Sequence, residues 1–295
     1  MRRCLSAEYI HTHMKKTIIS ICLLFISVSP LFAAQNSRYI SLAPSTTEIL
    51  FALGLDDEIA GVSSFCDYPP RAKNKEKVGD FSSPNIEKIL SLKPDYIFCT
   101  GLEQNPTIES LKRYGLPVYV ADPQNIHELL ASIMEIGRLT KKDVQAQQLT
   151  DVMRAEIGNI SRQTRDIPEA QRLKVFIEIW FEPLTTAGSP SFIDELITLA
   201  GGVNIAKDTL RPYSIFSAEE VIKRNPDCIF LAYMTEEKPV EMVKKRFGWQ
   251  RINAVKNNRI YNDIEPDIIL RPGPRITQGL RLLYEKLYLS GEQKH

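Results

Sequence analysis

Apolar and polar positions alternate in distinct blocks along the N-terminal half of the chain. Short apolar runs predict strands at residues 39–42, 55–62, 96–99 and 118–120. Apolar residues at helical spacing predict helices that begin near residues 44, 87 and 108. Because the strands alternate with helices of ordinary length, this half has the pattern of a parallel α/β sheet.

A different pattern extends from residue 126 to residue 167. Apolar residues recur there at mostly helical spacing with charged residues between them, and no proline occurs after Asn125 until Pro168. This predicts a helical connector of about 40 residues, with residues 140–142 as the place where it would break. The segment is too long for a crossover between neighbouring strands, so it predicts a rigid link between two lobes.

After Pro168 the alternation of strands and helices resumes. An apolar run predicts a strand at residues 173–181, and residues 188–191 open a helix that ends at Gly201-Gly202. This helix start resembles that of the first half, because Pro190-Ser191 matches Pro44-Ser45 and Asp194 matches Glu48. The same order of elements in both halves predicts a duplicated architecture.

Two further segments, one in each half, carry nearly the same pattern. In residues 85–98 and 217–230, a polar cap precedes a helix, a Pro-Asp pair follows it, and an apolar strand comes next. Glu87 and Glu219 occupy the same place in the two copies. Each is explained locally by the helix dipole, which favours such an acid by about 0.3–1 kcal/mol. The matched pair also fits a partner that contacts both lobes, whereas Glu220 fits a capping box with Ser217.

The first 34 residues have the pattern of a secretory signal peptide. Met14 is the expected start, Lys15-Lys16 form the positive region, and an apolar stretch leads to Ala33-Ala34. The alternative is an uncleaved membrane anchor, although the apolar stretch is shorter than the ~20 residues needed to span a bilayer. Cys22 follows Ile21 rather than a small residue, which argues against a lipoprotein. We expect an exported, periplasmic protein.

The composition limits the classes of function. The 37 Lys and Arg residues nearly balance the 36 Asp and Glu residues, so neither nucleic acid nor an anionic membrane is an expected partner. No phosphate-binding loop, paired metal-binding histidines or Gly-x-Ser-x-Gly elbow occurs. Only His127 and His295 follow the predicted signal peptide, and His295 is the terminal residue. A secreted hydrolase that uses a histidine would therefore depend on His127. We therefore expect no enzyme, no metal site and no resident cofactor.

Three cysteines follow the signal peptide, and their odd number leaves at least one thiol unpaired. Cys99 and Cys228 lie in predicted strands, where a buried free thiol is favoured over a disulfide. Cys66 lies in a turn-like segment and is the candidate for reactivity.

Several motifs together resemble those of the periplasmic cobalamin-binding proteins. They are Pro44-Ser45-Thr46-Thr47-Glu48, residues 62–70, Val78-Gly79, residues 85–95, residues 201–205 and Arg271-Pro272-Gly273-Pro274-Arg275. These proteins belong to the helical-backbone group of ABC-transporter binding proteins, which also carries haem and ferric siderophores. The resemblance covers residues 38–289.

The resemblance implies two α/β lobes with parallel-type sheets, joined by a long rigid backbone helix, with a ligand cleft between the lobes. The lobes would comprise residues 38–125 and 172–291, and the connector residues 126–167. A protein of this kind captures cobalamin or a related corrinoid and delivers it to an ABC importer, and we expect it to be monomeric when free. Glu87 and Glu219 match the two acids that dock on arginines of the permease subunits.

The resemblance also implies a set of ligand-binding residues. Phe65, Phe81 and Tyr213 match aromatic positions that pack on the flat corrin, although core packing is the alternative for the two phenylalanines. Arg271 matches a cleft arginine, whereas Arg275 fits a helix start or an internal ion pair. Tyr68 lies in the same loop as Phe65 and is included in the set.

The chain departs from the family pattern in several places, and these departures leave the cargo open. Thr100 and Thr185 replace two aromatic residues, and Trp180 and Phe181 are the candidates to compensate for them. Ala200 and a residue near Leu283 replace a cysteine pair. The alternative cargo is haem or a ferric siderophore, for which Cys66, Tyr68 or His127 would be candidate iron ligands. A secreted hydrolase is the remote alternative.

Overall fold

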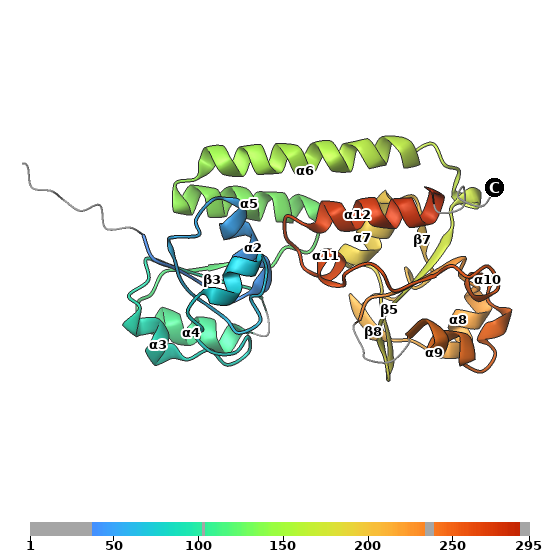
Figure 1. The fold of residues 1–295 in the computed structure, drawn as a ribbon, viewed down its shortest axis with the longest axis horizontal. Helices are drawn as coiled ribbons and strands as arrows, with labels where there is room; N and C mark the ends of the chain where they lie inside the picture. Colours follow the sequence, from blue (N-terminus) through green and yellow to red (C-terminus); the bar gives the residue numbers. More distant parts are fainter. Residues whose placement is uncertain (1–36, 102–103, 234–238, 290–295) are drawn as a thin grey trace, which may run out of the picture. The chain divides into compact units, whose positions relative to one another are not determined.

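The computed structural model describes residues 37–101, 104–233 and 239–289. From Ser37 onward the chain forms one compact unit, in which two α/β lobes lie beneath a layer of long helices (Figure 1). The predicted signal peptide lies outside the described residues.

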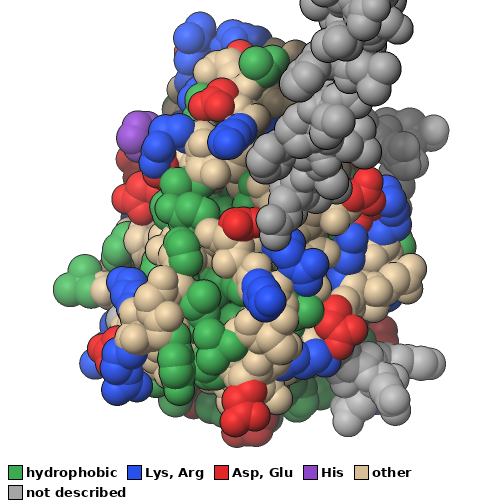
Figure 2. Space-filling model, turned by 90° about the vertical axis from the view of Figure 1, so that its left-hand side faces the viewer, with side chains coloured by type: hydrophobic (Ala, Val, Ile, Leu, Met, Phe, Trp, Pro, Cys, Tyr) green, Lys and Arg blue, Asp and Glu red, His purple; other side chains and the backbone are tan. Residues whose placement is uncertain are grey.

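The N-terminal lobe contains a parallel sheet of four strands, as the sequence predicts, and the structure gives their order as β2-β1-β3-β4. Its helices connect successive strands. The elements are β1 (Tyr39–Ser41), α2 (Pro44–Ala52), β2 (Ile59–Val62), the 3-10 helix Pro70–Asn74, α3 (Ile86–Ser91), β3 (Tyr96–Cys99), α4 (Asn105–Arg113) and β4 (Val118–Val120). Val120 and Tyr114 are exposed in this lobe. Seen from this end of the structure, apolar side chains form a band between charged groups (Figure 2).

The helical segment after this lobe consists of two helices rather than one rod. Helix α5 (Ile126–Thr140) ends at Lys141, which adopts a left-handed conformation with φ of 59°, and α6 (Asp143–Thr164) then runs back alongside α5 (Figure 1). The break therefore lies where the sequence predicts it, but it is a tight turn that reverses the chain. Helix α6, with 22 residues and a length of about 33 Å, then carries the chain to the C-terminal lobe (Figure 1).

The C-terminal lobe contains a six-stranded sheet in the order β10-β9-β5-β6-β8, with β7 paired to β5. Strands β10, β9, β7 and β5 are parallel, whereas β6 and β8 are antiparallel to their neighbours, so the expected parallel sheet is mixed here. The elements are the 3-10 helix Glu169–Gln171, β5 (Lys174–Phe181), β6 (Leu184–Ala187), α7 (Phe192–Leu199), β7 (Val203–Asn204), β8 (Tyr213–Ile215), α8 (Ala218–Arg224), β9 (Cys228–Leu231), α9 (Pro239–Lys245), the 3-10 helix Trp249–Arg251, α10 (Asn253–Lys256), β10 (Ile260–Tyr261), α11 (Asp267–Leu270), α12 (Ile276–Tyr284) and the π-helix Glu285–Leu289.

The repeated segments have the same local structure in both lobes. Lys93 and Asn225, which precede the two Pro-Asp pairs, both adopt left-handed conformations, with φ of 47° and 51°. Asp95 accepts a hydrogen bond from the backbone N–H of Arg38 at 2.7 Å, and Asp227 accepts one from that of Lys174 at 2.9 Å. Each aspartate thus fastens the strand that follows it to the neighbouring strand of its sheet. The two segments therefore share one local structure, although the sheets of the two lobes differ in strand order and direction.

The largest apolar cluster extends across both lobes. It includes Ile133 of α5, Met153 of α6, Leu196 of α7 and Leu280 of α12, all of them buried. Two smaller clusters lie within the separate lobes. Because a large apolar interface resists relative motion of the parts that it joins, we expect only small movements of the lobes.

Among the described residues, no helix is both long and apolar enough to cross a membrane.

Candidate functional site

A cavity of about 530 Å³ lies between the two lobes and is called the cleft cavity here. It lies where β3 and β4 end, and the carboxyl ends of parallel strands are the usual place for a ligand in α/β sheets. Its volume is typical of small-molecule sites. The N-terminal lobe contributes Phe81, Thr100, Gly101, Asp122, Pro123 and Gln124, and the C-terminal lobe contributes Ser191, Phe192, Pro212, Tyr213, Leu270 and Pro272.

Two of the aromatic residues that the resemblance assigns to the ligand line this cavity from opposite lobes. Phe81 is half-buried, and Tyr213 is 52% exposed. Thr100, which stands where the family pattern has an aromatic residue, lines the cavity as well. The cleft cavity therefore brings together three of the positions that the resemblance identifies.

A buried glutamine that the sequence did not point to holds the N-terminal wall of the cavity. Gln104 donates through its Nε2 to the carbonyl oxygens of Leu42 and Phe81, both at 2.8 Å. Its Oε1 accepts from the backbone N–H of Thr100 at 2.9 Å. Since every polar atom of this buried amide is hydrogen-bonded, Gln104 positions Phe81 and Thr100. A single glutamine before a proline-started helix gives no sequence signal for such a role.

The charge of the cleft cavity is low. Asp122 is the one charged residue among the described residues that line it, and the polar remainder includes Thr100, Gln124 and Ser191. Such a site suits a neutral or cationic ligand with hydrogen-bonding edges better than a strongly anionic one.

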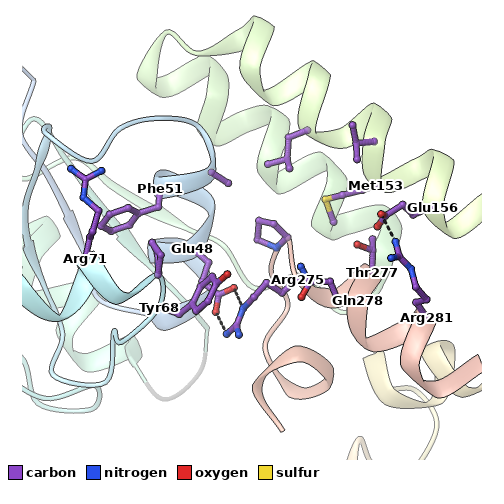
Figure 3. A pocket seen from close by; sticks show the side chains of 15 residues that line it. Glu48, Phe51, Tyr68, Arg71, Met153, Glu156, Arg275, Thr277, Gln278 and Arg281 are labelled. Carbon is purple, nitrogen blue, oxygen red and sulfur yellow. Dashed lines mark hydrogen bonds and ion pairs between the residues drawn. The ribbon is translucent and has the colours of Figure 1, made fainter. Parts of the chain in front are cut away.

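The other residues of the predicted ligand set lie elsewhere. Phe65 is 57% exposed and does not line the cleft cavity. Tyr68 lines a second cavity of about 660 Å³ between α2, α6 and α12 (Figure 3). Arg271 lies between two residues that line the cleft cavity, but its guanidinium contacts Asp67 and Asp267, each at 2.8 Å.

Four charged residues connect the lobes beside the second cavity, and we call them the inter-lobe ion-pair cluster: Glu48, Asp67, Arg271 and Arg275. Arg275 donates two hydrogen bonds to Glu48, at 2.9 and 2.7 Å, and both side chains are buried. Its guanidinium also lies 3.7 Å from the centre of the Tyr68 ring (Figure 3). The internal ion pair that the sequence offered as one role for Arg275 is confirmed, and it fixes the relative position of the lobes.

Burial and ion pairing have opposite effects on the pKa values of the two acids in this cluster. Burial raises the pKa of Glu48 above its ordinary value, despite the hydrogen bonds and charge of Arg275. Asp67 is less buried. Partial burial alone would raise the pKa of Asp67, but the hydrogen bond and charge of Arg271 outweigh it and lower this pKa.

The two acids assigned to docking stand at matching, exposed positions. Glu87 lies in the first turn of α3, capped by Asn85, and Glu219 in the first turn of α8, capped by Ser217. Neither carboxylate has a hydrogen-bonding or ionic partner among the described residues, so both are available to a partner protein. Glu220 instead pairs with Lys223 and Arg224, so only the Ser217 half of the predicted capping box forms.

The structure does not arrange the cysteines or His127 for thiol chemistry, hydrolysis or metal binding within the described residues. Cys66, Cys99 and Cys228 are free and buried, as favoured for the latter two. Cys66, the candidate for reactivity, is 1% exposed, and burial raises its pKa, which disfavours the reactive thiolate. His127 is exposed at the start of α5, without a side-chain hydrogen bond in the described part of the chain. Across residues 37–101, 104–233 and 239–289, no group of three or more His, Cys, Asp or Glu residues is placed to hold a metal ion.

Comparison with known sequences places this architecture among transport proteins. A family model described as "Periplasmic binding protein" matches residues 40–265. The uncharacterized ABC transporter substrate-binding lipoprotein YvrC of Bacillus subtilis is 36% identical over 259 residues, which cover 86% of this chain and 81% of that protein. The vitamin B12-binding protein of Pectobacterium carotovorum is 31% identical over 256 residues, covering 86% and 89%.

Solved structures agree with the fold and differ in cargo. A possible iron-binding periplasmic protein from Staphylococcus epidermidis has 35% identity and a TM-score of 0.75, covering 85% of this chain and 98% of that chain. The vitamin B12 binding protein BtuF of Vibrio cholerae has 29% identity and a TM-score of 0.75, covering 87% and 98%. The haem-binding protein RhuT from Roseiflexus has 25% identity and a TM-score of 0.75, covering 87% and 100%. These likenesses confirm the predicted fold of two α/β lobes.

Proposed function

The chain belongs to the periplasmic binding protein family of ABC-transporter substrate-binding proteins, and we propose that the cargo it captures is cobalamin or a related corrinoid. Members of this class bind vitamin B12, haem or iron compounds and are not enzymes, so the hydrolase alternative falls away at the level of the family. The choice among these cargoes rests on the cleft cavity.

The observation that carries the proposal is the combination of aromatic rings and low charge in that cavity. Phe81 and Tyr213 stand on opposite lobes, where a flat macrocycle between them would bury apolar area on both faces. The amide groups at the edge of a corrin are neutral and can both donate and accept hydrogen bonds, which suits Thr100, Gln124 and Ser191. A haem with two carboxylates would meet Asp122 and no cation among the described lining residues.

The ligand is tested by retention. The purified protein is incubated with cyanocobalamin, cobinamide, haemin or a ferric siderophore, and the absorbance that co-elutes with it in gel filtration is measured. We expect a corrinoid to be retained. Retention of haemin or of the siderophore without any corrinoid would overturn the proposed cargo.

A haem cargo is the second candidate, and the phenol of Tyr213 is the observation that favours it. This side chain is half exposed on the cavity wall and carries an oxygen that can ligate ferric iron. If haemin is retained, Tyr213→Phe would abolish the charge-transfer absorbance of a tyrosinate-bound iron. With a corrinoid cargo the same variant would change affinity only slightly, since the ring remains.

We further propose that the protein acts in the periplasm after cleavage of the signal peptide and docks on permease subunits through Glu87 and Glu219. The docking proposal is supported by the matching exposed positions of the two carboxylates, one on each lobe. The double variant Glu87→Arg/Glu219→Arg should abolish corrinoid uptake by cells while leaving corrinoid affinity intact, because neither residue lines the cleft cavity.

The matched control for docking is Glu109→Arg/Glu241→Arg, which reverses two other exposed or half-exposed acids, one in each lobe. We expect this control to transport normally. Normal uptake by the Glu87/Glu219 variant would refute the docking assignment.

A further inference from the structure

The second cavity, between α2, α6 and α12, is lined by one face of each of these helices. The face of α6 consists of residues that lie three or four positions apart, the spacing that puts side chains on the same side of a helix: Leu149, Val152, Met153 and Glu156. Figure 3 shows Met153 and Glu156 on the side of α6 that faces Thr277 of α12. Phe51 lines the cavity from α2. The cavity is therefore built by three helices, one of which belongs to each lobe and one to the connector.

The wall of the second cavity is largely apolar. Met153 is buried, Phe51 and Leu149 are half-buried, and Val152 is 59% exposed. Covering such side chains with an apolar molecule lowers the free energy of the system. The volume of about 660 Å³ is typical of small-molecule sites and exceeds that of the cleft cavity. The shape and the wall therefore suit a small apolar ligand.

Every charged side chain among the described residues that line the second cavity already has a partner of opposite charge. The pairs are Arg71 with Asp56, Arg275 with Glu48, and Arg281 with Glu156. A charged ligand would have to compete with these ion pairs, whereas an uncharged ligand leaves them in place. The charges of the site therefore favour an uncharged ligand.

One buried polar group on the wall has no partner. Thr277 is 4% exposed, and its hydroxyl forms no hydrogen bond with any other residue in the described part of the chain. Burying a hydroxyl without a partner is unfavourable, and a hydroxyl can both donate and accept a hydrogen bond. Because Thr277 lines the second cavity, a ligand bound there can supply the missing partner.

From these observations we propose that the second cavity is a binding site for a small, uncharged, largely apolar molecule that forms one hydrogen bond with Thr277. This site is separate from the cleft cavity, with which it shares no lining residue among those described. The inference goes beyond the proposed function and does not depend on the cargo. Since α2 belongs to the N-terminal lobe and α12 to the C-terminal lobe, the bound molecule contacts both lobes beside the inter-lobe ion-pair cluster.

Titration with N-phenyl-1-naphthylamine, an uncharged aromatic amine whose fluorescence rises in an apolar site, tests the proposal. Val152→Arg places a long charged side chain on the cavity wall and should weaken binding of this probe at least about tenfold. Val144→Arg is the matched control, because Val144 lies on the same helix, is 66% exposed and does not line the cavity. We expect this control to bind the probe as the wild type does. No saturable binding to the wild type, or equal affinities of the two variants, would overturn the site.

Two further measurements sharpen this test. Thr277→Val keeps the shape of the side chain but removes its hydroxyl, so the affinity for the probe should fall about three- to tenfold. An unchanged affinity would overturn the hydrogen bond assigned to Thr277. In thermal unfolding, saturating probe should raise the midpoint of the wild type and of Val144→Arg but not that of Val152→Arg, because a ligand stabilises only a folded state that binds it. The same scans without the probe verify that each variant is folded, and an equal rise in all three proteins would contradict the site.

Discussion

The two lobes meet in two regions of opposite character. In the cleft cavity, Phe81 and Tyr213 are partly exposed, and one charged residue is present among the described lining residues. In the inter-lobe ion-pair cluster, Glu48 and Arg275 are buried and hydrogen-bonded to each other, and Arg271 joins Asp67. The cleft cavity leaves two aromatic rings partly exposed, whereas the charged groups of the cluster are paired with one another.

The two regions therefore have different roles: one binds the ligand, and the other fixes the relative position of the lobes. Covering partly exposed rings with a ligand lowers the free energy of the system. Disturbing a buried ion pair raises the free energy of the folded protein. We therefore assign ligand capture to the cleft cavity and the fixed spacing of the lobes to the ion-pair cluster. The apolar cluster that extends across both lobes acts in the same direction as the ion pairs.

The largest effect is expected from breaking the cluster. Arg275→Met removes both hydrogen bonds of the buried Glu48 and leaves it only the more distant Arg271, at 3.7 Å, as an ion-pair partner among the described residues. We expect the free energy of unfolding to fall by about 3–5 kcal/mol, as measured by urea denaturation. Arg281→Met is the control, because the ion pair of Arg281 with Glu156 is partly exposed and contributes at most about 1 kcal/mol. Equal losses of unfolding free energy in the two variants would show that the buried cluster stabilises the fold no more than the ion pair of Arg281 with Glu156.

An intermediate effect on binding is expected from the cleft cavity. Tyr213→Ala removes one of the two opposed rings and should weaken corrinoid binding by about 1.5–3 kcal/mol, or roughly 10- to 100-fold, in a calorimetric titration. Its free energy of unfolding should stay near that of the wild type, since the ring is half exposed. Tyr114→Ala, at an exposed tyrosine outside the cavity, is the control. A loss of stability without a loss of affinity would reverse the assignment of the two regions.

The smallest effect concerns the pH dependence of the Asp67–Arg271 pair. Because the pKa of Asp67 is lowered in the folded protein, this pair stabilises the fold above the ordinary value of 3.8, and its contribution is lost as the pH falls through the folded value. Asp67 is about half exposed, so the contribution should be below about 1 kcal/mol.

Urea denaturation at pH 6 and pH 3 checks this expectation. The difference in stability between wild type and Asp67→Asn should shrink at the lower pH, whereas Asp166→Asn, at an exposed acid, should show little difference at either pH. A difference that grows on acidification would contradict the pairing.

The sequence predicted those features that depend on neighbouring residues. The position of the turn at Lys141 and the two capped helices with Glu87 and Glu219 follow from local patterns of apolar, polar and proline residues. Even so, a local pattern gives only the position of a break, not the direction of the chain after it, so the reversal at Lys141 was missed.

Features that join distant residues were harder to predict. Glu48 and Arg275 are 227 residues apart, and Glu48 was interpreted only as a helix-start residue. The antiparallel strands β6 and β8 were missed because they are four and three residues long and contain several polar residues. Phe81 and Tyr213 were identified through the family resemblance, but their meeting across the cleft follows only from the fold.

The central claim is that the cleft cavity takes a corrinoid, and calorimetric titration of the purified protein with cyanocobalamin and with haemin tests it most directly. We expect one corrinoid to bind per chain, with higher affinity than haemin. Tighter binding of haemin, or no heat of binding with cyanocobalamin, would contradict it.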